Sequence, residues 1–126
     1  MTAHGKNRPQ EDRKPKDAAG IFIHHAKVYI LADRYSIARL MDLSFHKLHQ
    51  ALVGYLDEGH RVEGIVGVLR FCCAGDAPEK LRQMMEHYAA CNIKTLWGSE
   101  EFQELVEDCG SLSRDIIGRL IPRIAY

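Results

Sequence analysis

The sequence lacks a net charge, because its 17 Lys and Arg residues balance its 17 Asp and Glu residues. A chain without excess positive charge has no general attraction to nucleic acid or to acidic membranes. It also lacks an apolar run of about 18 residues, as a membrane-spanning helix needs, and its polar start lacks the apolar segment of a secretory signal. We therefore expect neither a nucleic-acid nor a membrane partner, and a cytoplasmic or nuclear protein.

The motifs of common catalytic and metal sites are also missing: HExxH, paired CxxC, GxSxG, GxGxxG and a phosphate-binding glycine loop. Seven histidines include His46 and His49, three residues apart, but no spacing supplies the three or four ligands of a zinc site. Without a disulfide framework, the cysteines are expected to be reduced packing residues; they are Cys72, Cys73, Cys91 and Cys109. We predict no catalytic residue, metal, cofactor or small-molecule substrate. The alternative is a small helical metal-binding protein or enzyme that uses its His and Cys residues.

Signals for β-structure are absent too, since there is no alternating strand pattern and no Asn-Gly or Asp-Gly hairpin turn. From Ile21 onward, apolar residues recur at helical spacing. The sequence therefore predicts an all-α fold: about six short amphipathic helices in a compact bundle. Residues 1–19 are polar and are expected to form a flexible tail, residues 20–122 the helical domain, and residues 123–126 a short C-terminal tail.

Within the first helix, spacings of three and four place one set of residues on a common face: Ile21, His25, Val28, Leu31, Ala32 and Tyr35. Of these, Val28, Ala32 and Tyr35 are expected to pack. Ser36 is the predicted N-cap of a second helix, which is expected to end before Gly59. Cys72 and Cys73 fall in the apolar stripe of the third helix. Asp76 and Ser99 are candidate N-caps of later helices, and Pro122 is expected to close the last one.

Three segments of the chain together resemble fungal proteins of the BTB/POZ family. They are VYILADRYSIARLMDLS (28–44), LRQMMEHYAACNIKTL (81–96) and SEEFQELVEDCGSLSRDII (99–117), and they occur in the order found in that family. The resemblance covers roughly residues 21–121. It implies the terminal helices of a BTB domain, a hairpin at 21–55, followed by the family's helical extension. The β-containing half that precedes this hairpin in the family has no counterpart in the sequence.

The resemblance and the lack of catalytic motifs together predict a non-enzymatic protein–protein interaction module, either a truncated BTB/POZ-type protein or a helical part that acts alone. Apolar residues near the start of the first helix extend beyond a single stripe, and exposed apolar patches usually mark interfaces. We therefore expect self-association or a protein partner, with an interaction surface formed by Ile21, Phe22, Ile23 and Ile30. A fragment without independent function is the remaining alternative.

Overall fold

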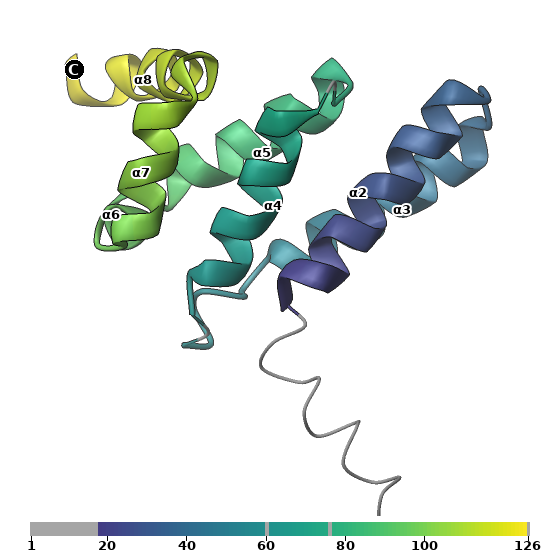
Figure 1. Cartoon of the computed structure of the whole chain (residues 1–126), viewed down its shortest axis with the longest axis horizontal. Helices are drawn as coiled ribbons and strands as arrows, with labels where there is room; N and C mark the ends of the chain where they lie inside the picture. The colour runs from purple at the N-terminus through teal and green to yellow at the C-terminus, as the bar shows by residue number, and fades with distance from the viewer. Residues whose placement is uncertain (1–17, 60, 76, 126) are drawn as a thin grey trace, which may run out of the picture.

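The computed structural model describes residues 18–59, 61–75 and 77–125, and Figure 1 shows their arrangement. Every regular element in these residues is an α-helix, which confirms the predicted all-α fold. With the labels of Figure 1, the helices are α2 (Ala18–Arg34), α3 (Ala38–Leu52), α4 (Glu63–Ala74), α5 (Glu79–Cys91), α6 (Ile93–Trp97), α7 (Glu100–Asp108) and α8 (Gly110–Ala125). The predicted flexible tail lies mostly outside the described residues, but Ala18 and Ala19 belong to α2.

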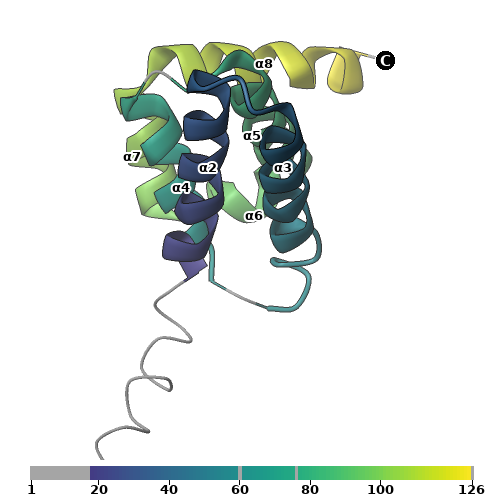
Figure 2. The ribbon, with the colours of Figure 1, turned by 90° about the vertical axis from the view of Figure 1, so that its right-hand side faces the viewer.

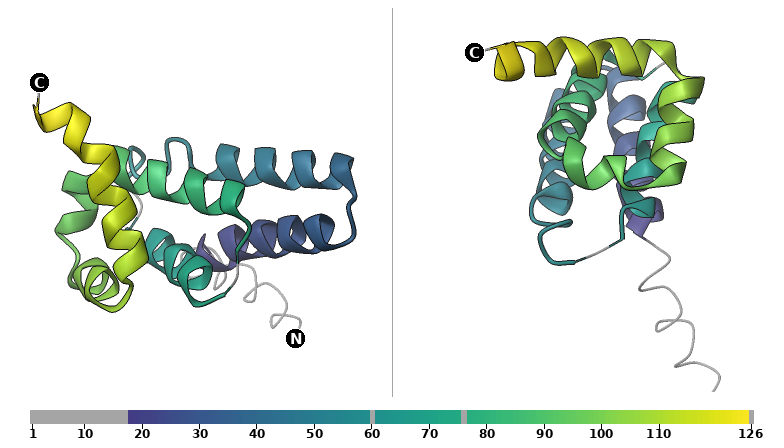
Figure 3. Two further views of the ribbon diagram at one scale, coloured as in Figure 1. Left: turned by 90° about the horizontal axis from the view of Figure 1, so that it is seen from above. Right: turned by 90° about the vertical axis from the view of Figure 1, so that its left-hand side faces the viewer.

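The helices form successive layers across the molecule. The α2–α3 hairpin lies at one side, the α4–α5 pair lies next to it, and α6, α7 and α8 form the other side (Figure 1). Helix α2 packs on α3 and α4, α4 packs on α7, and α5 packs on α8. The C-terminal end of α8 extends past the other helices (Figure 3). The hairpin is therefore an outer layer that is covered from one side only (Figure 2).

A tight turn joins α2 to α3, and it overturns the prediction that Ser36 is an N-cap. Ser36 has a positive φ of 58°. The Ser36 N–H donates to the Asp33 carbonyl at 3.2 Å, and the Ile37 N–H donates to the Ala32 carbonyl at 2.9 Å. These two bonds define a Schellman motif, in which a left-handed residue ends the preceding helix. Ser36 thus terminates α2, while Ile37 takes the N-cap position of α3 without a side-chain hydrogen bond.

Small residues bring α2 and α4 close together. A Cβ atom at Gly67 would lie 2.9 Å from the Ala19 Cβ atom, and one at Gly64 would lie 3.0 Å from the Ala18 Cβ atom. Real Cβ atoms do not approach so closely, so this contact requires glycine on α4 opposite alanine on α2. Ala18 and Ala19, which fall inside the predicted tail, therefore belong to the packed part of the structure.

The core receives side chains from all seven of these helices. Its largest fully buried members are Phe22, Leu48, Leu52, Ile65, Leu69, Leu81, Met85, Leu96, Phe102 and Leu105. The Phe22 ring meets the Tyr55 ring edge-on, with centroids 5.1 Å apart. Tyr55 lies beyond the end of α3 at Leu52, because Gly54, with φ 78°, already ends the helical path. Gly59, the predicted break, lies further along the same loop.

The later helices confirm one predicted cap and correct one predicted end. The Ser99 hydroxyl accepts the Phe102 N–H at 3.2 Å, so Ser99 caps α7 as expected. Helix α8 does not end at Pro122 but continues to Ala125, so residues 123–125 are not a tail. Proline fixes φ near its helical value and removes one hydrogen bond, a loss that the last turn of a helix tolerates. The candidate cap Asp76 lies outside the described residues.

Candidate interaction surface

Helix α2 has apolar residues on two faces. The face that is buried is not the one that the sequence analysis predicted. Phe22, Ala26 and Tyr29 point into the core. The predicted stripe instead faces outward at Leu31 and Tyr35, which are 50% and 65% exposed. Ile21, which was also expected on the interaction surface, is 50% exposed. Val28 of the same stripe is half-buried, and only Ala32 is fully buried. The prediction of the helix is confirmed, but the prediction of its inner face is wrong.

The four residues of the predicted interaction surface lie in three different environments. Ile21 is exposed. Ile23 and Ile30 are half-buried and pack against the core. Phe22 is only 2% exposed, so it cannot belong to an exposed surface. Phe22 is buried because its ring fills the space between α2 and the loop that carries Tyr55. The structure therefore does not bring these four residues together on one surface.

Helix α3 continues the exposed apolar region beyond the turn. Ile37 and Leu43 are about half exposed, and Leu40 lies between them at helical spacing. These three side chains line a shallow depression together with Arg39, Asp42 and His46. Because Tyr35 and Ile37 flank Ser36, the apolar residues of the two helices meet at the turn. We call the set Ile21, Val28, Leu31, Tyr35, Ile37, Leu40 and Leu43 the outer face.

Basic and titratable side chains accompany the outer face. Partial burial lowers the pKa of His25, and the neighbouring charges of His24 and Lys47 lower it further. Lys47 belongs to α3 and His25 to α2, so charges from both helices act on the His25 ring. In Figure 2 the hairpin is seen from this side, with none of the other labelled helices in front of it. The outer face thus forms an accessible apolar surface with cationic neighbours.

The sequence signal for this arrangement was present but ambiguous. The series Phe22, Ala26 and Tyr29 has the same helical spacing as the predicted stripe, and it combines two large aromatic side chains with a small residue that permits close packing. A helix with two apolar faces does not reveal from its own sequence which face the rest of the chain covers. The exposed residues Leu31, Tyr35, Ile37 and Leu43 were therefore missed as surface residues.

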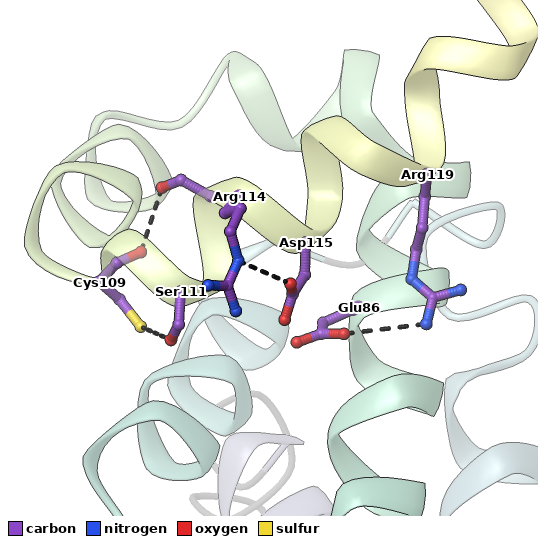
Figure 4. A network of polar contacts seen from close by, with 7 residues as sticks. Glu86, Cys109, Ser111, Arg114, Asp115 and Arg119 are labelled. Atoms are coloured by element: carbon purple, nitrogen blue, oxygen red, sulfur yellow. Dashed lines mark hydrogen bonds and ion pairs between the residues drawn. The ribbon is translucent and has the colours of Figure 1, made fainter.

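A second group of polar side chains lies where α5 meets α8. The Glu86 side chain on α5 is buried, with 7% of the residue exposed, and its Oε1 atom lies 3.8 Å from the Arg119 guanidinium. The Asp115 carboxylate points toward Glu86 and accepts a hydrogen bond from Arg114 at 3.3 Å (Figure 4). Burial raises the pKa of Glu86 to about 7, and its hydrogen bond with Asp115 adds to that effect. The same hydrogen bond lowers the pKa of Asp115.

The cysteines differ in their surroundings. Cys72 is buried in the core, and burial raises its pKa to about 12. Cys73 is half-buried, and burial together with a hydrogen bond to Cys109 raises its pKa to about 12. Cys109 lies between α7 and α8, while Cys91 is exposed on α5. The expected packing role fits Cys72 best.

Histidine and cysteine side chains were the candidate metal ligands. His46 and His49 are both exposed on α3, and the His24 and His25 rings lie 5.5 Å apart on α2. Within residues 18–59, 61–75 and 77–125, no three His, Cys, Asp or Glu side chains gather in a way that could hold a metal ion. In the same part of the chain, none of the helices has the length and apolar character to cross a membrane.

Comparison with known proteins found no significant match to the chain among protein-family models, curated protein sequences or solved structures. The fold and the surface therefore define the molecule only as a layered all-α protein with an accessible apolar face on its α2–α3 hairpin.

Proposed function

We propose that the chain is a non-enzymatic protein–protein interaction module, acting in the cytoplasm or nucleus, which binds through the outer face of the α2–α3 hairpin. The observation that carries this proposal is the second apolar face of α2, where Ile21, Leu31 and Tyr35 stay exposed after Phe22, Ala26 and Tyr29 have been buried. Exposed apolar residues that gather on one helix face mark a surface at which a partner can bind. The outer face has the composition expected of an interface centre, with an aromatic residue among aliphatic ones.

The resemblance to fungal BTB/POZ proteins supports the same surface. The segment 28–44 spans the end of α2 and most of α3, including the turn at Ser36. In that family the corresponding hairpin directly follows the β-containing half of the BTB domain. We propose that the outer face is complementary to such a half, in another chain or in a longer form of this one, or to a second copy of the chain.

Self-association provides a direct test. Light scattering coupled to size-exclusion chromatography would measure the molar mass over a range of protein concentrations, and binding of an apolar dye would report exposed apolar surface. We expect the mass to rise with concentration and the dye to bind. Exchange of two outer-face residues for acids, in the variant Leu31→Glu/Leu43→Glu, should reduce both signals, because a charge in the centre of an apolar interface is costly to bury.

The variant Ile117→Glu/Ile121→Glu is the matched control. These two isoleucines on α8 are about as exposed as Leu31 and Leu43, and the exchange changes the net charge by the same amount. The control should leave self-association unchanged. A strictly monomeric protein at high concentration with little dye binding would refute the proposal, as would an equal effect of the control variant.

A further inference from the structure

Two thiols from distant parts of the chain meet at the junction of α4, α7 and α8. Cys73 lies in the last turn of α4, and Cys109 lies between α7 and α8. The Ser111 hydroxyl, 3.6 Å from the Cys109 sulfur, lines the same cavity as Cys73, so the two thiols lie at the same junction. An interaction between the two side chains also contributes to the pKa of each thiol. The neighbouring Cys72 is turned into the core. The packing of α4 against α7 holds the pair of thiols in place.

Cys109 is placed to form a thiolate. It is the N-cap of α8, because its carbonyl accepts the Ser113 N–H at 3.2 Å. Its sulfur lies 3.6 Å from the Ser111 Oγ atom (Figure 4). Partial burial alone would raise the pKa of this thiol, but hydrogen bonds from Cys73, from the Ser111 hydroxyl and from the N–H groups of Ser111 and Leu112 outweigh burial and lower the pKa. Backbone amides at a helix start stabilise a sulfur anion in the same way as other anions.

Cys73 is the protonated member of the thiol pair, because burial raises the pKa of Cys73 to about 12. Cys73 and Ser111 both line a cavity of about 300 Å³ that is partly open to solvent, as do Arg82 and Glu86. A small peroxide is far smaller than this cavity. A hydroperoxide in this cavity can reach Cys73 and Ser111, and the Ser111 hydroxyl lies 3.6 Å from the Cys109 sulfur.

We propose that Cys109 and Cys73 form a redox-active dithiol that a hydroperoxide converts into a disulfide. The Cys109 thiolate attacks the outer oxygen of the peroxide, the O–O bond breaks, and the departing oxygen takes up a proton to leave as an alcohol or as water. Cys109 is thereby oxidised to a sulfenic acid. The Cys73 sulfur then attacks the Cys109 sulfur, and the sulfenic hydroxyl leaves as water with the Cys73 proton. Two thiols are oxidised by two electrons, and one peroxide is reduced.

The disulfide would tie the end of α4 to the start of α8 and close the chain segment that contains α5, α6 and α7. A cross-link of this kind reduces the freedom of the unfolded chain. The oxidised protein should therefore melt at a higher temperature than the reduced protein. This site does not involve the outer face, so it adds a chemical response to the interaction function proposed above.

The test treats the full-length protein with hydrogen peroxide, blocks the remaining thiols under denaturing conditions and maps tryptic peptides by mass spectrometry. We expect a disulfide between the peptides 71–80 and 95–114, located by fragmentation at Cys73 and Cys109, with the loss of two hydrogen atoms. A reductant should reverse both the cross-link and the rise in melting temperature. The variants Cys73→Ser and Cys109→Ser should abolish the cross-link, and the Cys73→Ser variant should accumulate a sulfenic acid at Cys109.

Serine at position 109 retains an N-cap hydroxyl for α8, so loss of the cross-link in Cys109→Ser would not reflect a lost helix cap. Cys72→Ser tests the adjacent buried thiol and Cys91→Ser the exposed one, and both variants should cross-link as the wild type does. Four unmodified thiols after peroxide treatment would overturn the proposal, and so would a disulfide that joins Cys109 to Cys72 or Cys72 to Cys73. Ser111→Ala, which removes one hydrogen bond to the Cys109 sulfur, should slow the oxidation.

Discussion

At the scale of single residues, two neighbouring apolar side chains on α2 differ in burial. Phe22 is 2% exposed and contacts the Tyr55 ring, whereas Ile21 is half exposed. Removing a buried phenylalanine leaves a cavity, so Phe22→Ala should lower the free energy of unfolding by about 3–5 kcal/mol. Ile21→Ala should change it by less than about 1 kcal/mol. Urea denaturation of the two variants measures the difference, and equal effects would contradict the assignment of the two faces of α2.

Glu86 predicts a pH dependence of stability. Its pKa in the folded protein, about 7, lies above the ordinary value of 4.5, so folding favours the protonated form. The stability that this group provides is fully present below about pH 4.5 and is lost as the pH rises through about 7. The loss is at most about 3 kcal/mol, and the opposite pKa shift of Asp115 offsets part of it.

Glu86→Gln removes this titration and keeps a carbonyl oxygen that can accept from Arg119. The variant should therefore be more stable than the wild type above about pH 7, and its unfolding free energy should depend less on pH between about pH 5 and 8. Urea unfolding at several pH values checks this, with the exposed Glu107→Gln as the control variant. An unchanged pH profile in Glu86→Gln would show that another group is responsible.

At the scale of the elements, the contact between α2 and α4 depends on a missing side chain. A Cβ atom at Gly67 would lie 2.9 Å from the Ala19 Cβ atom, whereas one at Gly118 on α8 would meet nothing within 4 Å. Gly67→Ala should therefore destabilise the protein, because the overpacking costs about 1–3 kcal/mol and exceeds the gain in helix propensity. Gly118→Ala should stabilise it by up to about 1 kcal/mol. Thermal melting compares the two, and a more stable Gly67→Ala variant would mean that α2 and α4 can move apart without loss.

Local signals predicted the helices well, and non-local contacts account for most of the errors. Ser99 was recognisable as a cap because serine precedes two glutamates and Phe102 at the spacing of a helix start, and its hydroxyl does bond the Phe102 N–H. Ser36 carries the same type of side chain, but its backbone is set by the Schellman bonds at the end of α2. A short polar residue between two helices fits either role, so the sequence did not distinguish them.

At the scale of the whole molecule, the candidate sites depend on contacts that no local pattern contains. Cys73 and Cys109 meet only because α4 packs on α7, and Glu86 meets Asp115 only because α5 packs on α8. The sequence predicted an exposed apolar region at the start of the chain's helical part, and Ile21 lies in it. The choice of Phe22 was wrong because helical spacing does not say which of two apolar faces the later helices will cover.

The charge balance of the whole chain predicts how its self-association depends on pH. The formal net charge is zero at pH 7 with neutral histidines, and protonation of all seven histidines would raise it to +7. Histidines His24, His25 and His46 lie beside the outer face, so two outer faces would then repel each other. Self-association should therefore weaken as the pH falls and the chain gains positive charge.

Sedimentation velocity at a fixed protein concentration measures this change. Added salt at about pH 5.5 should restore part of the association, because ions screen the repulsion between exposed charges. The variant His24→Gln/His46→Gln should lose less of its association at low pH than the wild type does. Stronger association at low pH, or no response to salt, would show that the apolar outer face is not where the copies meet.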